Sequence, residues 1–291
     1  METKLIELFL LICDFYDNQP ILKHQRLSNF KPRFSDQELL TIYVFRHLQG
    51  FSTQRLIYDY FARHWRTWFP ALPSYQAFNR RLHQLTPAFE LFIESNLCAA
   101  GKSENLAAAD RLIDSLPVML AQGSRANRAR VARQLADVGY YATKQIHYCG
   151  LKLHVIAARR LSKLPLPERL FLSSASQHDL AALREMDANL SGCGLFGDKA
   201  YADTELKTVL RERRVYLTTP YKRKRNEDET VVPRLLNRFV SGIRQPIESL
   251  FGWMIQRTDI QNASGVRSIQ GLMLHCYGKL AVASLLLTSY S

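Results

Sequence analysis

Three carboxylates lie where the sequence predicts buried elements. Asp114 lies inside the apolar run at 111–120, Asp198 follows Leu195 and Phe196, and Glu248 lies in an apolar-periodic helical segment. An ionised carboxylate among apolar neighbours is costly unless a cation or hydrogen-bond donors compensate it. Three carboxylates that converge also repel one another, and they are stable together mainly around hard divalent cations. The chemistry that these residues favour is therefore divalent metal binding.

Such a site has a characteristic use. Two divalent ions roughly 3.5–4 Å apart clamp the attacking and leaving oxygens of a phosphoryl transfer. A cationic side chain stands beside one of the carboxylates, since Lys199 follows Asp198 directly. Lys199 is a candidate for contact with a phosphate, and its alternative interpretation is an ordinary solvated lysine.

The charge of the chain favours a polyanionic partner. Lys and Arg number 39 against 26 Asp and Glu, a net charge of +13. An excess of this size predicts binding to nucleic acid, and the alternative is a basic but otherwise ordinary enzyme. Two basic segments are further candidates for backbone contact, with Arg125, Arg128 and Arg130 in the first and Lys222, Arg223 and Arg225 in the second.

The cysteines and the apolar runs predict where in the cell the protein resides. The five cysteines are scattered and form no C-x-x-C pair, which argues against a disulfide framework or a zinc site. The N-terminal apolar residues recur at helical spacing among acidic ones, so an amphipathic helix is expected there. The last apolar run, 280–287, is too short to span a bilayer. We expect a cytoplasmic protein without a membrane segment.

Strand and helix patterns after about residue 105 predict an α/β domain. Strand-like runs, a helix from Ser176 and further helices alternate in the order strand, strand, strand, helix, strand, helix, strand, helix. This is the order of a ribonuclease-H-like mixed sheet flanked by helices. The first and fourth strands are neighbours in such a sheet, and the helix after the fifth crosses the same edge. Asp114, Asp198 and Glu248 are therefore expected to converge.

Residues 1–104 are predicted to form an all-helical domain. Ser35 and Glu38 form a capping-box pattern before one helix, and two more helices are expected at 52–69 and 75–85. This arrangement is a candidate helix-turn-helix domain, with Arg80 and Arg81 of its third helix contacting DNA. A generic helical bundle is the alternative. The predicted domains are thus 1–104 and 105–291.

Three segments carry a resemblance to a known family. "LIDSLPV", "GDKAY" and "RQPIESLFGWM" resemble the signature regions of DDE transposases of bacterial insertion sequences. The second matches Asp-x-Gly/Ala-Tyr through Asp198 and Tyr201, and the third matches Arg-x-x-x-Glu through Arg244 and Glu248. The resemblance runs from about residue 108 to the C-terminus. It departs from some members at Ser241 and Ile255, where those carry tyrosine and lysine.

The resemblance implies a metal-dependent recombinase. Asp114, Asp198 and Glu248 would hold two Mg²⁺ ions, for which Mn²⁺ can substitute, and Arg244 would contact a phosphate near the scissile bond. The enzyme would cut at the ends of its element and join the freed 3′-hydroxyls to target DNA, as a homodimer on paired ends. Two alternatives stay open: a nuclease or resolvase that cuts without joining, and a non-catalytic DNA-binding regulator.

Overall fold

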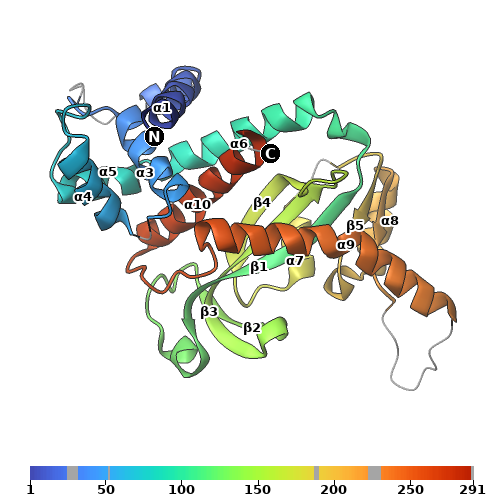
Figure 1. Ribbon diagram of the computed structural model, residues 1–291. Coiled ribbons are helices and arrows are strands. Elements are labelled where there is room, and N and C mark those ends of the chain that lie inside the picture. Colours follow the sequence, from blue (N-terminus) through green and yellow to red (C-terminus); the bar gives the residue numbers. More distant parts are fainter. Residues whose placement is uncertain (25–31, 52, 187–189, 222–230, 290–291) are drawn as a thin grey trace. The chain divides into compact units, whose positions relative to one another are not determined.

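The computed structural model describes residues 1–24, 32–51, 53–186, 190–221 and 231–289 (Figure 1). The chain divides into two compact units. The first comprises Met1–Ser95 with Gln270–Leu285, and the second comprises Asn96–Ile269 with Leu286–Ser291. This division differs from the predicted 1–104 and 105–291, because the first boundary falls earlier and most of the last helix packs with the N-terminal unit.

The first unit is helical, and its helices α3, α4 and α5 begin at side-chain caps. In the capping box predicted before α3, the Glu38 N–H donates to Ser35 Oγ at 3.1 Å and the Ser35 N–H donates to Glu38 Oε2 at 2.6 Å. The second predicted helix is shorter than expected, because it ends at His64. The helices are α1 (Glu2–Asp17), α2 (Pro20–His24), α3 (Asp36–Leu48), α4 (Gln54–His64), α5 (Tyr75–Gln84), the first part of α6 (Thr86–Ser103) and most of α10 (Ile269–Ser289).

Aromatic side chains dominate the core of the first unit. The ring centroid of Phe61 lies 5.6 Å from that of Phe45 and 5.3 Å from that of Phe69, both in edge-to-face geometry. Tyr43 of α3 is also buried, and it packs so closely on α10 that a Cβ on Gly278 would lie 2.3 Å from its hydroxyl oxygen. Only glycine permits this approach of the two helices.

Helix α10 is longer than the eight-residue apolar run that the sequence suggested. Its segment Ile269–Thr288 is long and apolar enough to cross a membrane by length and composition, and 67% of that segment is buried within the protein. The core helix of a globular protein has the same properties, so this is weak evidence for a membrane span. The expected absence of a membrane segment stays a prediction.

The second unit contains a six-stranded mixed sheet, in which the order β2-β3-β1-β5-β6 is completed by β4 pairing with β3. β3 pairs antiparallel with β1 on one side and with β2 and β4 on the other, while β1, β5 and β6 are parallel. The predicted ribonuclease-H-like fold is confirmed, including the pairing of the Asp114 strand with the Asp198 strand. The strands are β1 (Arg111–Gln122), β2 (Asp137–Tyr141), β3 (Ile146–Ala158), β4 (Leu166–Ser174), β5 (Cys193–Phe196) and β6 (Val215–Thr218).

Two local features differ from the prediction. The strand β2 was not predicted; it is only five residues long, and one of them, Gly139, is buried, so it lacks an apolar signal. The helix expected from Ser176 begins at Asp179, as α7 (Asp179–Glu185). Its cap is His178, whose Nδ1 accepts the Leu180 N–H at 3.3 Å. The Asp179 carboxylate instead accepts hydrogen bonds from Ser115 of β1 and Lys152 of β3.

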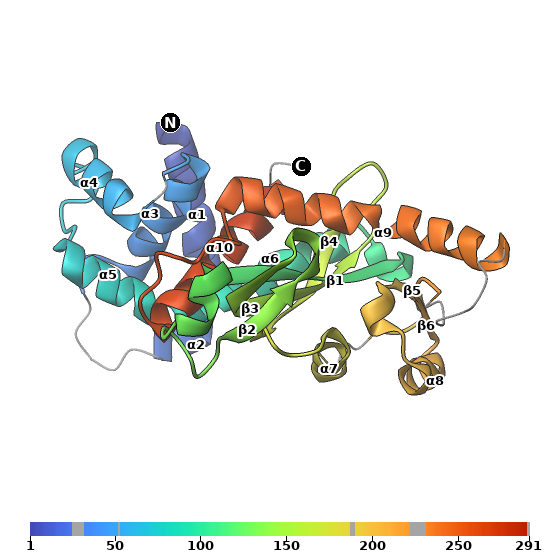
Figure 2. The ribbon, with the colours of Figure 1, turned by 90° about the horizontal axis from the view of Figure 1, so that it is seen from below.

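Helices cover both faces of the sheet. Figure 2 shows α9 (Val231–Thr258) along one face and α7 and α8 (Thr204–Glu212) on the other. Leu183 of α7 and Leu206 of α8 share a buried cluster with Ile113 of β1. Because successive strand residues point to opposite faces, Ile113 and Ser115 face α7 and α8, whereas Asp114 faces α9.

Candidate active site

A gap in the pairing of β1 surrounds Asp114. On the edge of β1 away from β3, β5 pairs only with Arg111 and Leu112. The segment after α9 reaches the same edge at Met119, whose N–H donates to Gln261 O at 2.8 Å. Asp114 lies between these two points. The strand therefore presents its aspartate where the neighbouring strand has ended, a position where sheets of this kind commonly bind ligands.

Arg244 of α9 contacts Asp114 directly. Its Nη2 donates to Asp114 Oδ2 at 2.9 Å, and the two side chains retain 12% and 22% of their exposure. The other carboxylate oxygen, Oδ1, accepts the Ser115 N–H at 2.8 Å. The buried Nε of Arg244 has no hydrogen-bond partner among the described residues. Two predicted site residues, 130 positions apart in the chain, are thus brought into contact.

Asp198 stands at the exit of β5. Gly197 continues the pairing of β5 by donating its N–H to Thr218 O at 3.1 Å, and the chain then turns into a short 3-10 helix at Lys199–Tyr201. Asp198 caps this turn, because its Oδ1 accepts the Ala200 N–H at 2.8 Å. This cap fixes the half-buried carboxylate at the end of the strand next to β1.

Asp114 is costly to ionise where it lies. Burial raises the pKa of its carboxyl to about 6, and the negative charges of Asp198 and Asp179 act in the same direction. The Arg244 guanidinium and the Ser115 N–H oppose the rise without cancelling it. Asp114 and Asp198 are therefore close enough to repel each other, which is the condition that a bound cation would relieve.

The raised pKa of Asp114 predicts a pH-dependent stability. Because the folded pKa of about 6 exceeds the unfolded value near 3.8, the native carboxyl keeps a proton that the unfolded one has lost. As pH rises through this window, the wild type should lose up to about 3 kcal/mol of unfolding free energy relative to Asp114→Asn. Urea denaturation of both proteins in EDTA, at several pH values, measures this difference. A difference that does not change with pH would contradict the assignment.

Tyr201 brings a buried hydroxyl to the same region. Its side chain is 1% exposed, and its hydroxyl has no hydrogen-bond partner among the described residues. Burial raises its pKa, and the charges of Asp179, Asp114 and Asp198 raise it further. The ring of Tyr201 belongs to the buried cluster that contains Ile113 and Leu206, and its hydroxyl is a buried polar atom left without a partner there.

The side chains near Asp114 provide only part of the oxygen ligands that a hard divalent cation needs. Carboxylate oxygens of Asp114 and Asp198 suit Mg²⁺ or Mn²⁺. Glu248, however, is exposed on α9, one turn beyond Arg244, and within the described part of the chain no three Asp, Glu, His or Cys side chains gather closely enough to hold a metal ion. The structure thus brings two of the three predicted carboxylates together and leaves the third on the adjoining helix.

A network that the sequence did not reveal lies on the opposite face of β1. Asp179 Oδ1 accepts hydrogen bonds from Lys152 Nζ at 3.1 Å and from Ser115 Oγ at 3.3 Å. It also lies 3.9 Å from Nδ1 of the fully buried His154. The signal available in the sequence was the His178-Asp179 pair, which also resembles the DDE transposase family and whose aspartate was expected at the start of a helix.

The two arginines predicted to contact DNA from α5 differ in their surroundings. Arg81 forms an ion pair with Asp36 and donates to Phe34 O at 2.7 Å, with its side chain 19% exposed. These bonds hold the guanidinium against the start of α3 and the chain before it, and the contact of Arg81 with DNA stays a prediction. Arg80 is exposed and remains a candidate for DNA contact.

The other predicted DNA contacts lie on the second unit. Arg125 and Arg128 belong to the 3-10 helix Gly123–Arg128, and with Arg130 they are exposed. Lys199 is exposed beside Asp198. These four side chains are accessible to a phosphate backbone. The remaining predicted contacts, Lys222, Arg223 and Arg225, lie outside the described residues.

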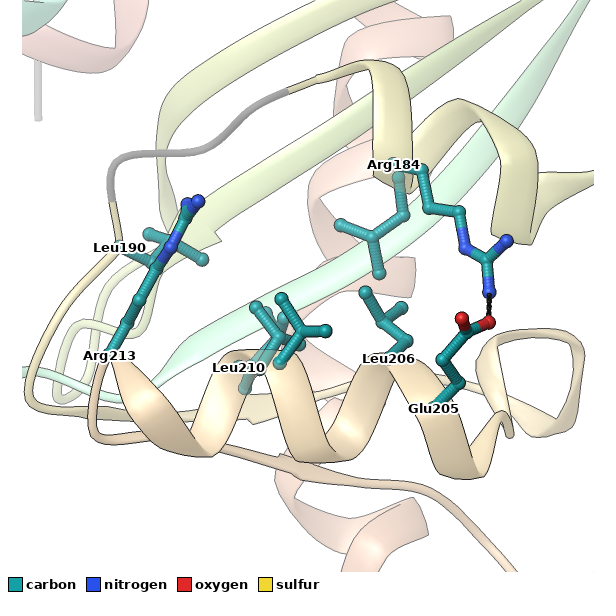
Figure 3. A pocket seen from close by; sticks show the side chains of 9 residues that line it. Arg184, Leu190, Glu205, Leu206, Leu210 and Arg213 are labelled. Atoms are coloured by element: carbon teal, nitrogen blue, oxygen red, sulfur yellow. Dashed lines mark hydrogen bonds and ion pairs between the residues drawn. The ribbon is translucent and has the colours of Figure 1, made fainter.

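A cavity of about 310 Å³ lies elsewhere in the second unit, among α7, β5 and α8. Figure 3 shows Leu206 and Leu210 projecting into it from α8, with Arg213 at one end and Arg184 paired to Glu205 at 2.8 Å at the other. None of the predicted site residues lines it. The acidic residues at the edge of β1 are therefore the candidate active site.

Comparison with known protein families finds a match over most of the second unit. A family model described as a transposase DDE domain matches residues 106–264, more than half of the chain. The matched region contains Asp114, Asp198, Arg244 and Glu248. No curated protein and no solved structure gave a match.

Proposed function

Since this chain belongs to the transposase DDE-domain family, we propose that it cuts double-stranded DNA at the ends of an insertion sequence and joins the freed 3′-hydroxyls to target DNA. The observation that carries the proposal is the pair of aspartates at the unpaired edge of β1, with Arg244 bonded to one of them at 2.9 Å. The two aspartates would supply oxygen ligands for a divalent cation, and the Arg244 guanidinium would supply a positive charge for a phosphate.

Asp114, Asp198 and Glu248 would hold the divalent ions. Two bound Mg²⁺ or Mn²⁺ ions would supply an activated oxygen nucleophile and charge stabilisation of the leaving oxygen. Arg244 would release Asp114 Oδ2, which it now occupies, and bond to a phosphate oxygen of the DNA. Glu248, one turn along α9, would then swing toward the two aspartates. Lys199 and the exposed arginines at 125, 128 and 130 would bind the backbone, and Lys222, Arg223 and Arg225 of the second basic tract would extend this contact.

The proposal includes the cell compartment and the assembly. A soluble cytoplasmic homodimer on paired ends accords with the free cysteines and with the need to cut two ends together. Two alternative activities use the same residues differently: a nuclease or resolvase would cut without joining, and a DNA-binding regulator would need no metal.

One experiment separates these functions. The purified protein is incubated with DNA that flanks its coding region, with Mg²⁺ or with a chelator, and any nicks are mapped. Pre-cut ends are then supplied with a target plasmid. We expect metal-dependent nicks at the element ends and joined products. Nicks without joining would indicate the nuclease, and DNA binding unaffected by the chelator, without nicks, would indicate the regulator.

Arg80 provides a test of DNA reading by α5. Arg80→Ala should weaken binding to the terminal sequences about tenfold and reduce the salt dependence of binding by about one phosphate contact. Electrophoretic mobility shifts over a salt series measure both effects. Arg55→Ala is the matched control, since Arg55 is exposed on α4 but already pairs with Asp59 at 2.8 Å. Equal affinities of the Arg80 variant and the wild type would exclude Arg80 as a DNA contact.

A further inference from the structure

The N-terminal part of α9 carries a row of large apolar side chains that the described part of the chain leaves between 37% and 74% exposed. They lie within the first nine residues of the helix and share one side of it: Val231, Val232, Leu235, Leu236 and Phe239. In Figures 1 and 2 this part of α9 projects beyond β5 and β6. Farther along, the apolar side chains of the same helix are buried, among them Val240, Ile247 and Leu250.

A side chain of the sheet extends this row. Tyr216 of β6 is exposed, and it pairs in register with Gly194, two residues before Phe196 on the same face of β5. The ring of Phe196 in turn lies against that of Phe239, with centroids 6.4 Å apart. Single exposed apolar side chains are common, but a contiguous group of six marks an interaction surface. We call the five side chains of the row and Tyr216 the α9 face.

The surroundings of the α9 face are basic. From Val231 to Ile247 the helix contains three arginines and no acidic residue, and Arg234 and Arg238 are exposed along one side of the row. The preceding segment, 222–230, contains no apolar residue that could cover it. The partner that fits such a surface is an apolar helix face flanked by carboxylates.

Helix α1 presents a surface of this kind. Ile6 and Leu10 are exposed one turn apart on the side of α1 away from its buried residues, and the exposed Glu7 and Asp14 lie beside them. The helix contains four acidic residues and one lysine, whereas the whole chain has a net charge of +13. Helix α1 and the α9 face are therefore complementary in charge, and both expose apolar side chains.

We propose that α1 of one copy of this chain binds the α9 face of a second copy. The inference rests on the proposed function, which includes a homodimer, and it names the surfaces that hold that homodimer together. Leu10 would pack on Leu235 and Phe239. Glu7 would then lie near Arg238. Pairing of two α9 faces would instead bring together the arginines of two chains that each carry a net charge of +13, which is unfavourable.

Sedimentation equilibrium of the full chain without DNA, over a range of protein concentrations, tests the inference. We expect the wild type to dimerise. Leu235→Asp and Leu10→Asp should each raise the dissociation constant of the dimer about 30-fold or more, the effect of losing a central interface side chain. Both leucines are 60% exposed, so the variants should fold, which thermal unfolding checks. Leu161→Asp is the matched control, because Leu161 is exposed outside both helices and its variant should dimerise as the wild type does.

A mixture of the two variants identifies the partner of the α9 face. A symmetric dimer contains the contact twice, and in either variant alone both contacts are damaged. In the mixture, α1 of the Leu235→Asp chain can bind the intact α9 face of the Leu10→Asp chain. The mixture should therefore associate about tenfold more tightly than either variant alone, a gain of about 1.4 kcal/mol.

Other occupants of the α9 face predict other results. If Leu235→Asp dissociated the dimer and Leu10→Asp did not, two α9 faces would pair and the contact with α1 would be excluded. A wild type that stays monomeric would overturn the inference, and a loss of DNA binding by Leu235→Asp would then assign the α9 face to DNA.

The results also separate this inference from the proposed function. A monomer that cuts and joins element ends would overturn the inference alone. Dimers that respond to the variants as expected, in a wild type that does not cut DNA, would support the contact and remove the proposed activity.

Discussion

Asp198→Asn should abolish DNA cleavage, by roughly 10³-fold or more, while leaving the binding of the element ends nearly unchanged. The amide can still accept the Ala200 N–H that now bonds to Asp198 Oδ1 at 2.8 Å, so the turn after β5 should persist. What is lost is the negative charge beside Asp114. The exposed cations proposed to bind DNA lie at other positions and are unaltered.

Single-turnover cleavage of a labelled end fragment in Mg²⁺ measures the first effect, and a mobility shift in EDTA measures the second. Asp203→Asn is the matched control, because it alters another helix-start aspartate of the same unit and should cleave at the wild-type rate. Cleavage at the wild-type rate by purified Asp198→Asn would remove this residue from the active site.

Gly150→Ala should have the largest effect on stability, a loss of more than about 4 kcal/mol or a failure to fold. Gly150 lies in the centre of β3, where a Cβ would meet Val118 O at 1.9 Å and Met119 Cα at 3.2 Å. Both contacts are with backbone of β1, next to an irregularity of the β1–β3 register between Met119 and Ala121. A backbone neighbour cannot move aside as a flexible side chain does, so the two strands would have to separate.

Urea denaturation compares Gly150→Ala with a glycine in open surroundings. Gly242 is exposed in α9, and a Cβ added to it would have no neighbour within 4 Å, so Gly242→Ala should be neutral or stabilise by up to about 1 kcal/mol. A Gly150→Ala protein as stable as the wild type would show that β1 and β3 are not packed as closely as described.

The sequence was sufficient to predict most of the sheet and the placement of Asp114 and Asp198 on neighbouring strands. The apolar runs around Asp114 and before Asp198 are long enough to identify strands, and the order of the elements then makes those two strands neighbours, as the pairing of Leu112 with Phe196 confirms. The strand β2 gave no comparable signal, because it is short and only one of its five residues is buried. Patterns of apolar residues identify the elements that face a core, but they are a weak signal for strands at the edge of a sheet.

Side-chain contacts between distant elements could not be predicted. The bond from Arg244 to Asp114 depends on how α9 crosses the sheet, and the pairing of Asp179 with Lys152 depends on which residues of β3 and α7 face each other. Arg80 and Arg81 could not be distinguished in the sequence, because the exposure of adjacent helical residues depends on which of them has a packing partner. The partner of Arg81, Asp36, is 45 positions away and is identified only by the structure.

The membership of α10 in the first unit constrains the order in which the protein can fold during synthesis. N-terminal domains generally fold first as a chain leaves the ribosome. Here the first unit needs Gln270–Leu285, including the glycine that lies against Tyr43, and these residues are made only after 174 residues of the second unit have been translated. The helices of the first 95 residues therefore cannot complete their core until Gln270–Leu285 has been synthesised, and part of that core stays exposed to solvent until then.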